Sequence, residues 1–388
     1  MKRLKSLHQW FFGFGSPLTI GVFRIIFGFL AFVCLLLLST SFGDWYSVTG
    51  YVTPDIAREV LFGKTYPDFL NGIESNSLIL IAFVATTVSA FLVMIGLFAR
   101  VATIVLALGL IGLHHRNIDI LNSGDTLMRL IAIYMVFAPS GAACSLDRLI
   151  RRWKGKEGAA LPEVSLWPQR LIGIQVALLY LTTAWHKSFG GRWLDGTATY
   201  YTGRLEEFER FPVPGLINEQ PMVMIATYYT LLIEVALGIL VFAKPTRKWV
   251  LIGGLVLHGG IEYGMNIPLF AFVICSTYIV YYDGDEIAGW FKRLAKRFSE
   301  RAINVSVPGA SSKGKLEVLE SLSPLGLVKY TPVNGEPWVA NRADGRAQSW
   351  VTASLARSMG AWLLWIAPPL WASIVRSSAV EDSSSAND

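Results

Sequence analysis

The chain has 388 residues, of which 53% are hydrophobic and 16% charged, and its formal net charge is +6 at pH 7. Because soluble domains carry about 25% charged residues, this composition excludes an ordinary soluble protein. The positive charge does not indicate nucleic acid, because it lies in short segments between apolar runs, as in cytoplasmic loops that face anionic lipid. Cys34, Cys144 and Cys275 lie far apart without a C-x-x-C spacing, so we expect neither a metal site nor a disulfide framework.

The first 16 residues are basic and aromatic, and they predict a cytoplasmic lead-in at the membrane interface. The apolar run that follows, residues 18–38, is too long for a signal peptide and ends without a small-residue cleavage site. It is long enough to cross a bilayer as an α-helix. Arg24 within it either faces the bundle or lies near the cytoplasmic end.

Residues 17–283 predict a transmembrane domain. Its apolar runs are 18–38, 77–98, 101–115, 126–139, 171–185, 222–243, 249–263 and 267–281. The fold class we predict is an all-α multi-pass membrane bundle of about eight transmembrane helices, although several runs are short for a full span. Basic segments alternate with acidic or neutral ones, so we expect the inner (plasma) membrane with the N- and C-termini both cytoplasmic.

The sequence after residue 283 predicts a small C-terminal cytoplasmic α/β domain. Residues 284–300 indicate a basic amphipathic helix on the inner leaflet. Residues 301–376 follow, with strands expected at 303–307, 327–330 and 338–340, helices at 311–320 and 351–365, and a turn at 344–345. Residues 368–371 could alternatively re-enter the membrane surface. Residues 377–388 are small, polar and acidic, and we expect them to be disordered.

The stretch from Trp185 to Tyr201 is the first candidate site, because it gathers His186, Lys187 and Asp195 at the end of an apolar run. Ionisable groups at the edge of a bilayer usually face an internal cavity. A second interpretation is that Lys187 extends to the headgroups while the tryptophans form an interfacial belt. The residues themselves leave both interpretations open.

Residues 114–125 form a second polar stretch between two apolar runs, beginning with His114 and His115. Adjacent histidines on a helix cannot point the same way, so a His–His metal pair is not expected. We expect one of them to face a cavity and the other the lipid headgroups. Asp125 and Arg129 are four residues apart and could pair.

Glu234 lies midway along an apolar run, where a carboxylate must be neutral or paired, and Arg129 and Lys187 are both candidate partners. His258 and Glu262 are four residues apart and could form a proton-relay pair on one helix face. The alternative for these polar groups is a structural network that joins helix to helix.

Together these stretches resemble a known family. Lys187 precedes Trp193-Leu-Asp-Gly-Thr-Ala198, and residues 115–117 (His-Arg-Asn) precede residues 122–125 (Asn-Ser-Gly-Asp), Pro139 and residues 145–147 (Ser-Leu-Asp). The combination resembles the HTTM (horizontally transferred transmembrane) domain, the membrane domain shared with vitamin K-dependent gamma-carboxylase.

The resemblance implies that Lys187 is the base that deprotonates a reduced, vitamin K-type quinone, with no metal. The animal enzyme has paired lysines where this chain has His186-Lys187. We assign His186 and Asp195 to the same catalytic set. The expected substrate-binding residues are Trp185, Trp193, Tyr200, His115, Asn117, Asp125, Glu234, His258 and Glu262.

The C-terminal tail resembles the thioredoxin-like DCC family, through Pro308-Gly309, residues 344–346 and the Trp- and Pro-rich end at 363–371. Ser311 and Gly314 stand at the positions of that family's C-x-x-C. Because thiol–disulfide chemistry needs a thiolate, this domain cannot perform it.

We therefore expect an enzyme that oxidises or epoxidises a quinol. Glutamate carboxylation is less favoured, because only two modest external loops are available, residues 41–76 and 188–220. The alternative is a non-catalytic membrane scaffold that binds lipid or a partner protein. Transport is less favoured, since no inverted repeat is evident. The expected partners are membrane lipid, a quinone and an unidentified protein, and not nucleic acid.

Overall fold

The computed structural model describes residues 2–53, 55–56, 59, 69–70, 72–297, 303–308, 320, 328–333 and 339–342. The chain divides into two units. One comprises Met1–Asp147 and Pro162–Asp283, and the other comprises Arg148–Leu161 and Gly284–Asp388.

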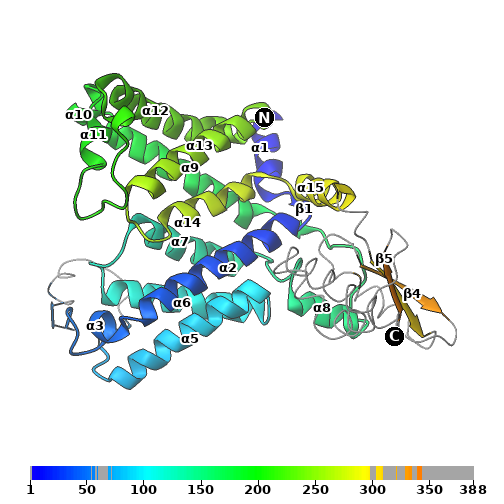
Figure 1. The fold of residues 1–388 in the computed structure, drawn as a ribbon. Coiled ribbons are helices and arrows are strands. Elements are labelled where there is room, and N and C mark those ends of the chain that lie inside the picture. The colour runs from blue at the N-terminus through cyan, green and yellow to red at the C-terminus, as the bar shows by residue number, and fades with distance from the viewer. Residues whose placement is uncertain are drawn as a thin grey trace, which may run out of the picture. The chain divides into compact units, whose positions relative to one another are not determined.

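The first unit is mostly helical (Figure 1). Its longer helices are α1 (Lys2–Phe12), α2 (Leu18–Ser39), α5 (Asn76–Ile95), α6 (Ala99–Arg116), α7 (Ser123–Phe137), α9 (Trp167–Lys187), α12 (Gln220–Ile239), α13 (Lys244–Gly264) and α14 (Phe270–Ser276). Short elements are β1 (Phe14–Gly15), α3 (Phe42–Tyr46), β2 (Val164–Ser165), α10 (Gly191–Leu194), α11 (Ala198–Thr202), η1 (Gly215–Asn218), η2 (Leu240–Phe242) and η3 (Thr277–Tyr281). A helix lies at each predicted apolar run.

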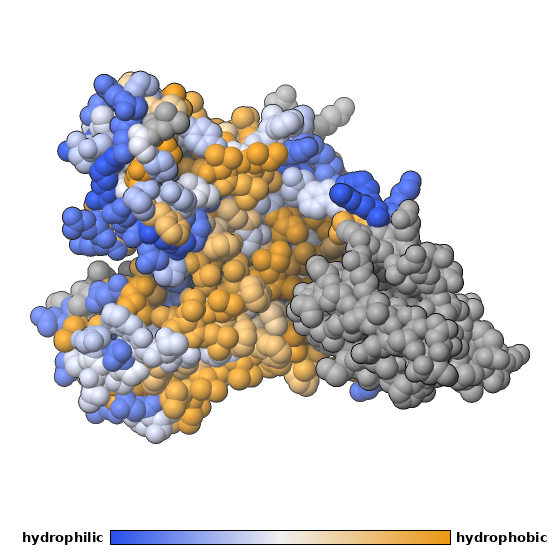
Figure 2. Space-filling view, in the orientation of Figure 1, coloured by the Kyte–Doolittle hydropathy of each residue, from blue (hydrophilic) through white to orange (hydrophobic). Residues whose placement is uncertain are grey.

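Among the described residues, three helices are long and apolar enough to cross a membrane: Leu18–Ser39, Asn76–Ile95 and Gln220–Phe242. At least half of each apolar stretch is not buried by the protein, so these side chains need an apolar environment outside it. Figure 2 shows the resulting apolar surface across the helices, with hydrophilic residues gathered at the end that carries α3, α10 and α11. The chain is therefore a membrane protein, and the number of eight spans stays a prediction.

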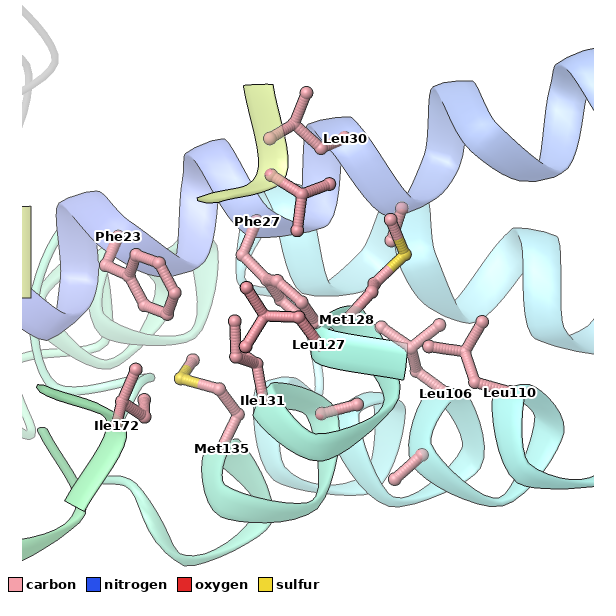
Figure 3. Close-up of a cluster of buried hydrophobic side chains, with 14 of the residues drawn as sticks. Phe23, Phe27, Leu30, Leu106, Leu110, Leu127, Met128, Ile131, Met135 and Ile172 are labelled. Carbon is pink, nitrogen blue, oxygen red and sulfur yellow. The ribbon is translucent and has the colours of Figure 1, made fainter. Parts of the chain in front are cut away.

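The core forms where α2 packs against α5, α7 and α14, and where α6 and α9 pack against α7. Phe23 and Phe27 of α2 meet Leu127 and Ile131 of α7 in this cluster (Figure 3). The fully buried Arg24 lies on the same helix and faces the bundle, as one of the two predictions required. Its guanidinium donates to the carbonyls of residues 93, 94, 140 and 144, so the charge is spread over several backbone dipoles.

The second unit contains most of α8 (Leu146–Trp153), α15 (Gly284–Arg297) and a three-stranded sheet. The amphipathic helix predicted at 284–300 corresponds to α15, which has acids in its first turn and bases in its last turn, as the helix dipole favours.

The three predicted strands correspond to β3 (Ile303–Pro308), β4 (Val328–Val333) and β5 (Val339–Arg342). Strand β3 is central, parallel to β4 and antiparallel to β5, so that Val305 is opposite both Tyr330 and Ala340. The expected helices at 311–320 and 351–365, the turn at 344–345 and the tail at 377–388 lie outside the described residues, except Glu320. The α/β class and the DCC resemblance of this unit therefore stay predictions.

Candidate functional site

The site lies where α9 ends against α12. After Lys187 the chain turns, and residues 191–202, which form α10 and α11, pack along the N-terminal half of α12. The Thr199 hydroxyl lies 2.8 Å from that of Thr227, and the Tyr228 hydroxyl donates to the Leu194 carbonyl at 2.9 Å. Residues 191–202 thus lie along α12 beyond the end of α9.

Gly196 permits this packing. Its φ is +79°, which favours glycine, and a Cβ atom there would lie 3.0 Å from Met224 Cγ and 3.1 Å from the Tyr228 hydroxyl. The glycine of the Trp-Leu-Asp-Gly-Thr-Ala motif is therefore required by a tight turn against α12.

Lys187 and Glu234 form an ion pair at this junction. The Lys187 ammonium donates to Glu234 Oε1 and lies 4.8 Å from the centre of the Trp193 ring. The Lys187 side chain is 26% exposed and that of Glu234 is 8% exposed. The other carboxylate oxygen, Oε2, is buried and has no hydrogen-bond partner among the described residues. Of the two candidate partners for Glu234, the structure selects Lys187.

The pair explains how a carboxylate is accommodated midway along an apolar helix. A buried carboxylate without a counter-charge is costly, whereas one that is hydrogen-bonded to an ammonium is compensated. The interpretation of Lys187 as a side chain extended to the headgroups does not fit, because its ammonium points to α12. The unused Oε2 lone pairs leave this carboxylate able to accept a further hydrogen bond or a proton.

A second buried polar group connects α9, α13 and η3. The Tyr180 hydroxyl lies 2.7 Å from His258 Nε2 and 2.7 Å from the Tyr278 hydroxyl. The predicted relay pair of His258 with Glu262 is wrong. Glu262 instead pairs with Arg210, while the His258 ring turns towards Tyr180, and its Nδ1 has no hydrogen-bond partner within the described part of the chain.

The other residues expected beside Lys187 do not gather around it. His186, Trp185 and Tyr200 are exposed, and Trp185 packs edge-on against the exposed Phe189. Asp195 is also exposed and accepts hydrogen bonds from the Thr197 hydroxyl at 2.6 Å and the Thr197 N–H at 2.9 Å. These bonds hold the pKa of Asp195 below its ordinary value, with the hydroxyl as the larger cause. Asp195 therefore shapes the turn.

The polar stretch at 114–125 lies elsewhere in the fold, and both of its histidines are buried. The expectation that one would face the headgroups is wrong because the α3 segment is bound to this end of α6. Arg116 donates to the Tyr46 carbonyl at 2.7 Å and the Leu70 carbonyl at 3.0 Å, and Asn117 donates to the Trp45 carbonyl at 3.0 Å. This arrangement anchors a loop to a helix end.

The remaining motif residues cap helices. The Asn122 side chain accepts from the Gly124 N–H, and Asp125 accepts from the Asn122 N–H at 2.8 Å, which forms a capping box at the start of α7. Asp147 accepts from the N–H groups of Phe98 and Ala99, both at 2.8 Å, at the start of α6. Asp125 and Asp147 thus fix the starts of helices. Of the predicted set, the structure gathers Lys187, Trp193 and Glu234, and His258 is close enough to Lys187 for an electrostatic interaction.

Sequence reasoning missed Tyr180, Tyr278 and Arg210. Tyr180 lies seven residues before Lys187, on the same face of α9, and that spacing could have revealed it. Tyr278 and Arg210 come from distant parts of the chain and carried no local signal. Among the described residues, no three His, Cys, Asp or Glu side chains converge to hold a metal ion.

The apolar helices and the partly buried ion pair at their junction define a helical membrane protein with a polar site between two helices. The HTTM domain family matches residues 15–285, and the chain belongs to this family. The uncharacterized protein YitO of Bacillus subtilis (strain 168) is 29% identical over 119 residues, which are 29% of this chain and 38% of YitO. The chain thus covers well under half of that relative. No solved structure matches it.

Proposed function

We propose that the chain is a membrane enzyme that acts on a reduced quinone, with the Lys187–Glu234 pair as the centre that removes a hydroxyl proton. The observation that carries this proposal is the ion pair itself. It combines a cation, an aromatic ring and a carboxylate oxygen that has no hydrogen-bond partner among the residues that the structure describes, at one junction of two apolar helices. Polar groups of this kind inside a membrane protein favour a functional site.

The residues present fit such a substrate. A quinol is flat and apolar with hydroxyl groups at its ring, so it needs an aromatic surface, a proton acceptor and a positive charge beside the oxygen that loses the proton. Trp193 supplies the ring, and the Lys187–Glu234 pair supplies the acceptor and the cation. The exposed Trp185 and Phe189 form an apolar surface at the end of α9, over which a substrate could enter from the bilayer.

Dioxygen is the second reactant that the family resemblance implies. Quinol and dioxygen give either quinone and hydrogen peroxide or quinone epoxide and water. Carboxylation of a protein glutamate is less favoured, because the external loops are too modest to present a large substrate. The chain's residues remove the proton and hold the resulting negative charge.

The proposed location is the inner membrane with both termini in the cytoplasm. The basic residues at 148–156 precede α9 and favour a cytoplasmic start for this helix. Lys187 then lies toward the external end, where residues 191–202 pack along α12.

Quinone retention tests the proposal. The protein would be purified in mild detergent, and the co-extracted lipid would be analysed by mass spectrometry, for wild type, Lys187→Ala and the control His186→Ala, whose side chain is exposed. We expect near-stoichiometric quinone in wild type and His186→Ala and much less in Lys187→Ala. Bulk phospholipid alone in all three would contradict the proposal and favour a scaffold that binds lipid or a partner.

A further inference from the structure

The two members of the Lys187–Glu234 pair differ in whether they can accept a further hydrogen bond or a proton. The Lys187 ammonium already donates to Oε1 of Glu234, whereas Oε2 of the same carboxylate is buried with no hydrogen-bond partner among the described residues. Glu234 is also the more buried of the two side chains, at 8% exposure against 26%. Oε2 therefore remains available as an acceptor, with the Thr183 hydroxyl next to the same carboxylate.

The chemistry of the two groups leads to the same division. The ammonium nitrogen of Lys187 has no lone pair, so in the ion pair Lys187 can only donate. The Glu234 carboxylate has lone pairs on Oε2 that can accept a proton. An ammonium carries three N–H donors, so Lys187 can hold Oε1 and still donate to a second oxygen.

We propose that Glu234, through Oε2, accepts the proton of the substrate hydroxyl, while Lys187 keeps its own proton and stabilises the negative oxygen that remains. This inference rests on the proposed function and assigns the roles within it. Glu234 is then the proton acceptor, and Lys187 acts as a fixed cation.

The step balances. The substrate O–H bond breaks, an O–H bond to Oε2 of Glu234 forms, and the electron pair of the broken bond stays on the substrate oxygen. One negative charge moves from the carboxylate to that oxygen. Throughout the step the Lys187 ammonium has one anion beside it, so no uncompensated charge is created in the interior.

If Lys187 were instead the base, it would have to be neutral before the reaction, and the ion pair with Glu234 that the structure shows would be absent. The two assignments predict opposite results for two conservative substitutions. Arginine cannot lose its proton, but it can replace the cation, whereas glutamine is close to glutamate in shape but cannot accept a proton.

The experiment compares Lys187→Arg and Glu234→Gln in the full chain, with reduced menaquinone as the probe. Oxygen uptake is measured, and an infrared difference spectrum is recorded on binding of the quinol. We expect Lys187→Arg to retain activity within about tenfold of wild type and Glu234→Gln to lose about a hundredfold or more. We also expect a protonated carboxyl C=O band in wild type and Lys187→Arg that is missing from Glu234→Gln.

Quenching of tryptophan fluorescence by the quinol shows whether Glu234→Gln still folds and binds. The reverse result, an active Glu234→Gln and an inactive Lys187→Arg, would overturn this assignment and leave the proposed function standing. Wild-type protein that neither binds the quinol nor consumes oxygen with it would overturn both. A carboxyl band that persists in Glu234→Gln would place the proton elsewhere and overturn the assignment alone.

Discussion

Lys187, the last residue of α9, donates a hydrogen bond to Glu234, which lies 47 residues later in α12. The pair continues a close contact between these helices, in which Gly238 packs against Leu181 one turn further along. It therefore links two helices in addition to forming the candidate site. This double role leads to separate predictions for stability and for activity.

Removing one member of the pair should destabilise the protein. Lys187→Ala leaves the Glu234 carboxylate buried without its cation, and since Lys187 is partly exposed we expect a loss of about 1–3 kcal/mol. Thermal unfolding in detergent would measure it. The exposed neighbour His186→Ala serves as the control and should change little. The double variant Lys187→Ala/Glu234→Gln should recover part of the loss. Equal stability of Lys187→Ala and His186→Ala would mean that the pair does not stabilise the protein.

Arg116 should hold the α3 segment to the end of α6. Its guanidinium donates to the carbonyl of Tyr46, the last residue of α3, and to the carbonyl of Leu70. Arg116→Ala should therefore make the α3 amides exchange hydrogen at least tenfold faster, which corresponds to about 1.4 kcal/mol. Arg116→Lys should restore only part of the protection, because a lysine lacks the planar fork. Hydrogen–deuterium exchange with mass spectrometry measures both variants. The control is Arg100→Ala, at the exposed start of α6, and an equal effect there would refute the anchoring role.

Gly196→Ala should disturb the packing of residues 191–202 on α12. The added methyl group would meet Met224 and Tyr228 in a backbone conformation that disfavours alanine, so we expect a cost of about 1 kcal/mol or more. Gly191→Ala is the matched control, since no atom in the described part of the chain lies within 4 Å of a Cβ atom there. Unfolding temperature and quinone retention should both fall for the first variant only. Similar behaviour of the two variants would contradict the structural role of Gly196.

The turn at Asp195 should depend on pH. Because hydrogen bonds from Thr197 lower the pKa of this carboxylate, its stabilisation is complete above the ordinary aspartate value of about 3.9 and is lost as the pH falls through the lower, folded value. Hydrogen exchange at the Thr197 amide, corrected for its intrinsic rate, should show protection that decreases below about pH 4. Asp195→Asn should abolish this pH dependence. Unchanged protection across that range would rule out the carboxylate as its source.

The helices could be predicted from the sequence because each apolar run is continuous, and an α-helix satisfies the backbone hydrogen bonds of such a run within lipid. Lys187 could be singled out because it closes such a run beside Trp193. The choice of Lys187 over Arg129 as the partner of Glu234 could not be predicted, because it depends on how α9 and α12 pack. For His258 the local spacing indicated the wrong partner. The four-residue spacing on one helix favoured Glu262, but His258 Nε2 lies beside the Tyr180 hydroxyl of another helix, and the Glu262 carboxylate pairs with Arg210.

The motif at 114–125 shows a further limit of sequence reasoning. Its polar residues resemble a binding site, yet Arg116 and Asn117 hold backbone carbonyls and Asp125 caps α7. A loop that folds back over a helix end leaves no periodic pattern in the sequence, so burial of both histidines could not be foreseen.

The most direct test of the proposed activity is oxygen uptake by the purified protein with reduced menaquinone. We predict uptake by wild type and by the control His186→Ala, with a loss of about a hundredfold or more in Lys187→Ala, which lacks the cation beside Glu234. Uptake that is absent from folded wild-type protein, or that is equal in wild type and Lys187→Ala, would contradict a quinol-oxidising site at the Lys187–Glu234 pair.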